Sequence, residues 1–238
     1  MIILNNVSRS FIAEHIETVA LDKLSLSVSQ GEFITILGPS GCGKSSLLNI
    51  LGMLDDIDEG SFVFKGTELA SASSSTKAQL RKKHIGFIFQ NFNLIDELTV
   101  EQNIALPLHY QQLNKAQRAA RVEEVLHRLD IAHRRTHLPA KLSGGQQQRV
   151  AIARAIVTQP DLILADEPTG NLDSKNSAQV MEILRQLNMM GTTIIMVTHA
   201  QEQVQYGTRV VRLMDGKIQQ DSPVSAQRTL CKQEVLSD

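Results

Sequence analysis

A glycine-rich segment between two apolar runs constrains this chain more than any other feature of its sequence. Residues 38–45 read G-P-S-G-C-G-K-S, which satisfies the pattern G-x-x-x-x-G-K-[S/T]. The apolar run at residues 33–37 predicts a buried strand before the segment, and the leucines and isoleucine at residues 47–51 predict a helix after it. A strand, a glycine-rich turn and a helix N-terminus form a cradle for a polyphosphate, because inward-pointing N–H groups bind anions.

The residues of this segment have separate expected roles. Lys44 would neutralise the β and γ phosphates, and the hydroxyl of Ser45 would bind Mg²⁺, a hard cation that prefers oxygen ligands. Cys42 stands near a helix N-terminus, where a thiol can be acidified, but small backbone fillers are the commoner case. The predicted phosphate-binding set is Gly38, Pro39, Ser40, Gly41, Cys42, Gly43, Lys44, Ser45 and Ser46.

The hydrophobic pattern predicts an α/β fold with one catalytic unit. Residues 24–28 alternate apolar side chains with serine, which is typical of a strand with one solvated face. Continuous apolar runs at residues 33–37, 85–89, 162–165 and 193–197 predict strands of a parallel sheet covered by helices. Residues 115–129 predict a surface helix of a helical subdomain, and another helix is expected to begin near Lys77 after a serine-rich loop.

Two adjacent carboxylates end the strand predicted at residues 162–165. Since neighbouring strand residues point to opposite sides, Asp166 and Glu167 cannot do the same job. Asp166 fits the Mg²⁺ side of a site at the carboxyl edge of the sheet, and Glu167 fits a residue that orients the attacking water. His199, after the strand at residues 193–197, either contacts a γ phosphate or the catalytic carboxylate or is structural. Gln90, after the strand at residues 85–89, either contacts Mg²⁺ and water or caps a strand.

Composition narrows the class of protein. The 238 residues carry a formal net charge of −1, which gives no global attraction to nucleic acid or anionic lipid. A four-residue basic cluster at 81–84 is expected to be a solvated helix end, so no direct nucleic-acid binding is predicted. The chain lacks an apolar run of ~20 residues and a secretory start, and its two cysteines, Cys42 and Cys231, suit a reducing compartment. We therefore expect a cytoplasmic single domain over residues 1–238, with a helical subdomain at about 91–158 and a polar tail at about 222–238.

A second glycine-rich turn, L-S-G-G-Q at residues 142–146, enters a run that reads Q-Q-R-V-A-I-A-R-A. Together with the phosphate loop and the carboxylate strand, this motif makes the chain resemble the ATP-binding-cassette (ABC) ATPases over about residues 2–221. The resemblance implies a P-loop cassette with a mixed or parallel core sheet, an N-terminal antiparallel β subdomain and a helical subdomain. It implies ATP and Mg²⁺ as cofactors, and a head-to-tail dimer in which each ATP lies between one phosphate loop and the partner's LSGGQ turn. The ATP contacts that it adds are Phe11, which would stack on adenine, Ser143, Gly144, Gly145, Gln146 and Asp173.

Smaller motifs indicate a subgroup of these ATPases. A-D-E-P-T-G-N-L-D at residues 165–173 and F-Q-N-F-N-L at residues 89–94 are typical of macrolide-export and lipoprotein-release ATPases. Ala200 after His199 departs from the family, in which Asp is frequent there.

Three functions are compatible with this resemblance. The leading one is a transporter ATPase that powers a separate membrane permease and sits on the inner face of the cell membrane through residues 92–98 and 101–108. A second is a module that regulates a membrane-bound cell-wall hydrolase through similar membrane subunits. A third is a non-transport ABC ATPase acting on nucleic acid, ribosome or chromosome, although the tandem cassettes, long insertions or basic extensions usual there are lacking.

Overall fold

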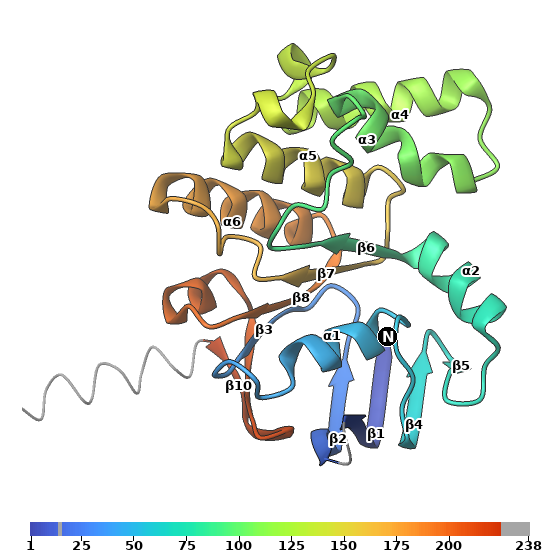
Figure 1. Cartoon of the computed structure of the whole chain (residues 1–238), viewed down its shortest axis with the longest axis vertical. Helices are drawn as coiled ribbons and strands as arrows, with labels where there is room; N and C mark the ends of the chain where they lie inside the picture. The colour runs from blue at the N-terminus through green and yellow to red at the C-terminus, as the bar shows by residue number, and fades with distance from the viewer. Residues whose placement is uncertain (14–15, 225–238) are drawn as a thin grey trace, which may run out of the picture.

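The computed structural model describes residues 1–13 and 16–224, and it is organised around a six-stranded sheet in the order β10-β9-β3-β8-β7-β6. Five of its strands run parallel to one another: β3 (Phe33–Leu37), β6 (Ile85–Ile88), β7 (Leu162–Asp166), β8 (Thr193–Thr198) and β9 (Arg209–Met214). Strand β10 (Lys217–Pro223) pairs antiparallel with β9 at one edge. The apolar runs are buried because helices or a second sheet cover both faces of this sheet (Figure 1).

One face of the core sheet carries the helical layer. It contains α3 (Val100–Ala105), η1 (Leu106–Tyr110), α4 (Lys115–Arg128), η2 (Ala132–Arg134), η3 (Pro139–Lys141), α5 (Gly144–Ile156) and α6 (Ser174–Met189). Thr99, Asn114 and Ser143 start α3, α4 and α5 with capping boxes, in which side chain and backbone satisfy each other's N–H groups. Ser143 thus has a local reason to begin a helix.

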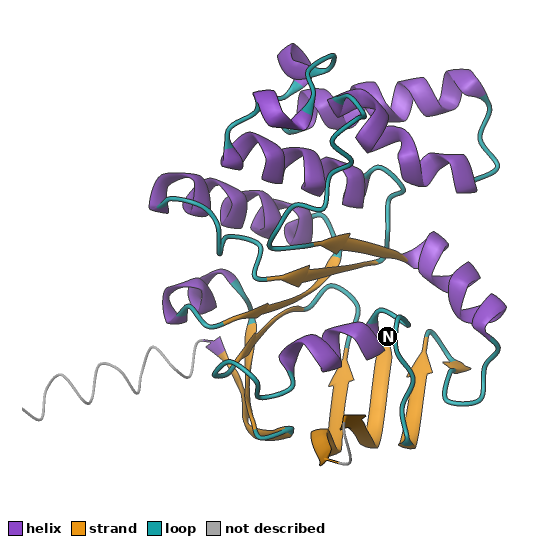
Figure 2. Cartoon of the chain, in the orientation of Figure 1, coloured by secondary structure: helices purple, strands orange, loops and turns teal. Residues whose placement is uncertain are grey.

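The other face of the core sheet packs against α1 (Lys44–Leu51) and a four-stranded antiparallel sheet in the order β2-β1-β4-β5. Its strands are β1 (Ile2–Ala13), β2 (Ile16–Val28), β4 (Glu59–Phe64) and β5 (Thr67–Glu68). One apolar cluster includes Leu4, Leu21 and Phe64 of this sheet, Leu47 of α1 and Ile36 of the core sheet. Figure 2 shows the two sheets below and above α1 as separate orange layers.

The predicted fold class is confirmed, with three local differences. Helix α2 (Ser74–His84) begins before Lys77, because the Ser73 hydroxyl caps it by accepting from Thr76 N–H. Residues 217–223 form β10, although the predicted polar tail included 222 and 223; a solvated edge strand is as polar as a tail. His84 is not part of a solvated helix end, since its ring is largely buried and bonds Asp161.

The described residues do not test two other predictions. Cys231 and residues 225–238 of the predicted tail lie outside them, and the division into subdomains stays a prediction. Within residues 1–13 and 16–224, no helix combines the length and the apolar character needed to cross a bilayer.

Candidate functional site

The phosphate loop connects β3 to α1. Gly41 and Gly43 adopt positive φ angles of 80° and 101°, a region that glycine enters without steric cost. A Cβ on Gly43 would lie 2.3 Å from the carbonyl oxygen of Ala20, so this glycine also permits close approach to β2. The backbone therefore turns directly into α1, whose first N–H groups have no acceptor within the helix and are available to bind an anion.

Lys44 is buried at the start of α1, and its ammonium lies over the loop itself. Its Nζ donates to the carbonyl oxygens of Gly38 at 2.8 Å and Pro39 at 2.7 Å. The Cys42 thiol is also buried, 3.8 Å from the same Nζ, which fits a small side chain that fills space under the loop. Ser45, by contrast, is exposed.

A cavity of about 670 Å³ opens beside the loop, hereafter the central cavity. The phosphate loop, the N-terminal sheet and the segments that follow β7 and β8 line it. Nine predicted site residues line it: Phe11, Ser40, Gly41, Gly43, Lys44, Ser45, Ser46, Glu167 and His199. Thr18, Val19 and Ala20 of β2 also line it and were not predicted; the pairing of Phe11 with Thr18 and of Ser10 with Val19 brings them there.

Glu167 and His199 form a pair at the carboxyl edge of the core sheet. Glu167 Oε1 lies 2.9 Å from His199 Nδ1, which is hydrogen-bonding distance. Glu167 has a φ of 42°, which is uncommon for a residue with a side chain, and its N–H donates to Val197 O at 3.0 Å. This turn directs the carboxylate to the central cavity rather than along the strand.

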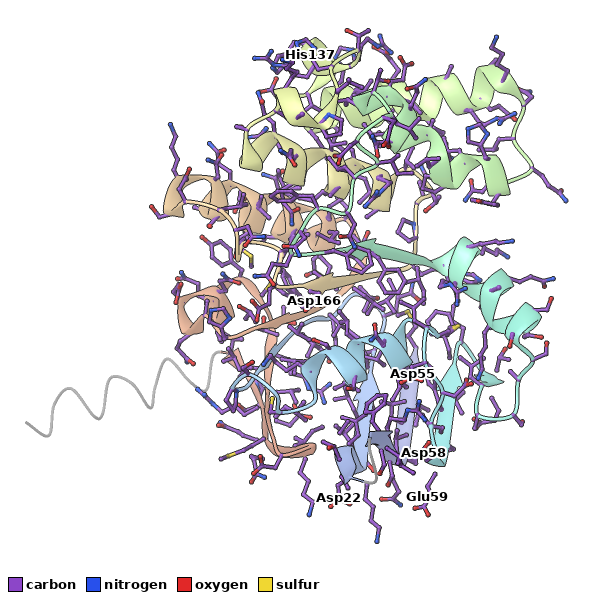
Figure 3. All side chains as sticks on the ribbon, in the orientation of Figure 1. Asp22, Asp55, Asp58, Glu59, His137 and Asp166 are labelled. Atoms are coloured by element: carbon purple, nitrogen blue, oxygen red, sulfur yellow. The ribbon has the colours of Figure 1, made fainter. Side chains whose placement is uncertain are left out.

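Asp166 ends β7 beneath this pair and lies in the middle of the molecule (Figure 3). Burial raises its pKa above the ordinary value, the charge of Glu167 raises it further, and Lys44 opposes the shift. A cation at this position would relieve both the burial and the repulsion between the carboxylates. The charge balance therefore fits the Mg²⁺ role predicted for Asp166.

Phe11 is 41% exposed and forms the far wall of the central cavity. The Arg9 guanidinium lies over its ring, 4.9 Å from the centroid. Arg9 is itself fixed by Asp55, at 2.8 Å, and Asp58, at 2.7 Å. One face of the aromatic ring is therefore held by a positioned cation, which is favourable for the ring's electron distribution.

The remaining predicted residues do not line the central cavity. Gln90 lies against Gly170, whose added Cβ would meet Gln90 Nε2 at 2.6 Å. Asp173 caps α6 by accepting from Asn176 N–H at 2.8 Å, and this backbone hydrogen bond lowers the pKa of its carboxyl. Gly38, Pro39 and Cys42 belong to the phosphate loop without lining the cavity, and Asp166 ends β7. Ser143, Gly144, Gly145 and Gln146 form the start of α5.

Comparisons with known proteins point to one family. A family model described as ABC transporter matches residues 21–170. An uncharacterized ABC transporter ATP-binding protein of Methanocaldococcus jannaschii is 47% identical over 218 residues, covering 92% of this chain and 97% of that protein. The macrolide export ATP-binding/permease protein MacB of Pasteurella multocida is 40% identical over 225 residues, covering 94% of this chain and 35% of MacB. The chain thus spans about a third of the length of the MacB proteins that it matches.

A solved structure extends the similarity to three dimensions. The dimeric post-hydrolysis state of the ATP-binding cassette MJ0796, bound to ADP and Pi, superposes with a TM-score of 0.87 and 38% identity. The match covers 94% of this chain and 99% of that one. Because the family model covers most of the chain and the fold agrees throughout, the chain is a member of the ABC transporter family and is an ATP-binding ATPase cassette of that family.

Proposed function

We propose that this chain binds ATP with Mg²⁺ in the central cavity and that its hydrolysis drives a separate membrane permease of the export or lipoprotein-release type. The observation that carries the proposal is that one cavity is lined by both the phosphate loop and the Glu167–His199 pair. Binding and hydrolytic groups therefore face the same space, as an in-line attack on a γ phosphate requires.

The residues divide between holding the nucleotide and acting on water. Phe11 would stack on adenine, while the loop N–H groups and Lys44 would hold the phosphates. Ser45, Asp166 and Gln90 offer oxygen ligands for Mg²⁺, which would neutralise developing phosphate charge. Glu167 would orient and polarise the attacking water, and His199 would hold the Glu167 carboxylate in place.

A second copy of the chain would complete the site. Residues 143–146 lie at the N-terminus of α5 and do not line this chain's own central cavity. A head-to-tail dimer would bring these N–H groups, with Asp173, to the ATP of the partner, and the similar cassette MJ0796 is dimeric. ATP would then hold two chains together, and hydrolysis would release them.

The permease would contact a groove beside the predicted segments 92–98 and 101–108. This groove has a volume of about 320 Å³, and Leu54, Phe87, Phe89, Pro107 and Tyr110 form its apolar part. Arg81, Lys82 and Arg154 give it basic sides. Such a surface suits an amphipathic helix of the permease that carries acidic residues.

A charge placed in this groove tests the docking surface. Tyr110 is 71% exposed, so Tyr110→Asp should leave the fold and ATP affinity intact while abolishing co-purification with the permease. Met189→Asp, at an equally exposed position on α6, is the matched control and should keep the permease. Loss with both variants, or with neither, would place the permease contact elsewhere.

The central test identifies what the cassette works with. Tagged Glu167→Gln protein is incubated with solubilised membranes of its own cell, ATP and Mg²⁺, and the bound proteins are identified by mass spectrometry. Recovery of a permease with a large extracytoplasmic domain supports the proposal. A cell-wall hydrolase in the complex would favour the regulatory function instead, and ribosomal or DNA-bound proteins alone would refute the transporter assignment.

A further inference from the structure

Two buried glutamines hold the backbone that directly follows Glu167. Gln148 of α5 is fully buried, and its Nε2 donates to the carbonyl oxygen of Pro168. Gln203 of η4 (Gln201–Tyr206) is 9% exposed, and its Nε2 donates to the Thr169 hydroxyl. The two amides reach this dipeptide from different elements, one from the helical layer and one from the helix that follows His199.

Packing alone does not account for these amides. Among the residues that the structure describes, neither Gln148 Oε1 nor Gln203 Oε1 has a hydrogen-bond partner. A buried polar atom without a partner is unfavourable, so packing alone would favour an apolar side chain of the same length at either position. The orientation of Gln148 is nevertheless determined, because the Pro168 carbonyl only accepts and must therefore face the amide nitrogen. Each glutamine thus donates one hydrogen bond to the same short segment, Pro168–Thr169.

That segment is a turn that needs support. Glu167 has a φ of 42°, and a residue with a side chain keeps this left-handed conformation only where its surroundings hold it there. Within the turn, Gly170 N–H donates to Glu167 O at 3.0 Å and Leu172 N–H donates to Thr169 O at 3.1 Å. These local bonds are few, so contacts from outside the turn decide whether it keeps its shape.

We propose that Gln148 and Gln203 are positioning residues that hold Pro168 and Thr169 from two sides and so keep the Glu167 carboxylate aimed into the central cavity. The proposal rests on the hydrolytic role proposed above for Glu167. The proposal also implies that the turn after Glu167 follows movements of α5 and η4. Gln148 lies two residues after the Ser143–Gln146 segment, and Gln203 lies four residues after His199. A displacement of either helix would be passed by one hydrogen bond to Pro168 or Thr169, which directly follow Glu167.

The test replaces each amide with an apolar side chain of equal length. Gln148→Met and Gln203→Met should lower kcat by about 10-fold or more, because small misplacements of a catalytic group cost up to about 100-fold. Affinity for a fluorescent ATP analogue should stay within about two-fold of the wild type, since neither residue lines the central cavity. Melting temperature should change little, because each change removes one unpaired buried oxygen while it leaves the Pro168 carbonyl or the Thr169 hydroxyl without its amide partner.

Gln205→Met is the matched control. Gln205 lies on the same η4 helix, is exposed and makes no hydrogen bond to the turn within the part of the chain that the structure describes, so this variant should keep wild-type kcat. Thr169→Val removes the other end of the Gln203 bond and should lower kcat as Gln203→Met does. The double variant should be no slower than either single variant, because both changes break one interaction. Additive losses would overturn the pairing.

Hydrogen exchange supplies a readout that does not depend on turnover. The amides of Gly170 and Leu172 should exchange faster in Gln148→Met and Gln203→Met than in wild type or Gln205→Met. Unchanged exchange with unchanged kcat would refute the positioning role, as would a kcat loss that follows a loss of melting temperature. If the wild type neither binds nor hydrolyses ATP, the proposed function fails, while faster exchange in the variants would still show that the glutamines hold the turn.

Discussion

At the scale of single residues, Asp166 is placed for function at the expense of stability. Burial, followed by the charge of Glu167, raises its pKa, so the folded state favours the protonated form. The stability that protonation supplies is present below about pH 3.8 and is lost as the pH rises through the raised pKa. Asp166→Asn should therefore unfold at higher urea than the nucleotide-free wild type at pH 7.5, with a difference that shrinks as the pH is lowered. A variant less stable than wild type at pH 7.5 would contradict this assignment, and loss of Mg²⁺-dependent hydrolysis should accompany the gain.

Arg9 is a residue whose effect on nucleotide affinity should be indirect. Its guanidinium lies over Phe11 and is held by Asp55 and Asp58, so Arg9→Lys keeps the charge but loses the flat stacking group. Such a contact is worth about 0.5–1 kcal/mol at an exposed site, which predicts a roughly two- to five-fold weaker affinity for an ATP analogue. Arg185→Lys, which alters an exposed pair with Glu182 on α6, should leave affinity unchanged in the same titration.

At the scale of elements, Asp161 joins three segments at the edge of the core sheet opposite the site. It precedes β7 and accepts from Lys65, in the turn between β4 and β5, and it bonds His84 at the end of α2. Burial alone would raise the pKa of Asp161, but hydrogen bonds from Lys65 and His84 lower it overall. Its contribution to stability is therefore present above about pH 3.8 and is lost as the pH falls through the lowered pKa.

Asp161→Asn should destabilise the protein by about 1 kcal/mol at pH 7, measured by urea unfolding, after allowance for partial exposure. The difference from wild type should disappear in acid. Glu123→Gln alters a half-exposed group that bonds Arg135 and His127 on the protein surface, and it serves as a control with little expected change. Equal effects of the two substitutions would show that Asp161 does not join the elements.

The elements also show which parts of the fold and the site could be predicted from the sequence alone. The strand before the phosphate loop and the positions of Lys44 and Glu167 were predictable, because the pattern that specifies them is local. Thr18, Val19 and Ala20 were missed because their place in the cavity depends on pairing between β1 and β2, which no short motif encodes. Gln148 and Gln203 were missed for another reason: a glutamine that is buried and directional looks the same in a sequence as one that is solvated.

At the scale of the whole molecule, two variants should distinguish ATP binding from ATP hydrolysis, because one loses binding and the other loses only hydrolysis. Lys44→Ala should weaken binding of a fluorescent ATP analogue, because it removes the charge opposite the phosphates. Glu167→Gln should bind ATP but hydrolyse it at least ~100-fold slower, since only water orientation is lost. Light scattering with ATP and Mg²⁺ should then show a dimer for Glu167→Gln and a monomer for Lys44→Ala. Near wild-type turnover of Glu167→Gln would refute its assignment, and unchanged affinity of Lys44→Ala would refute the cradle.

The central cavity is bounded by two different sheets, since Phe11 and Thr18 come from the antiparallel sheet while Lys44 and Glu167 follow strands of the core sheet. A nucleotide that touches both adds a cross-link between two layers that meet through apolar packing and a few polar contacts, such as the hydrogen bond from Arg209 to the carbonyl oxygen of Ser27. Bound nucleotide should therefore make the layers unfold together. The affinity for nucleotide then depends also on side chains that do not contact it. Leu21, fully buried where a Cβ on Gly43 would come within 3.2 Å of it, is one such side chain, and a scan for residues that control nucleotide affinity should return it alongside the phosphate loop.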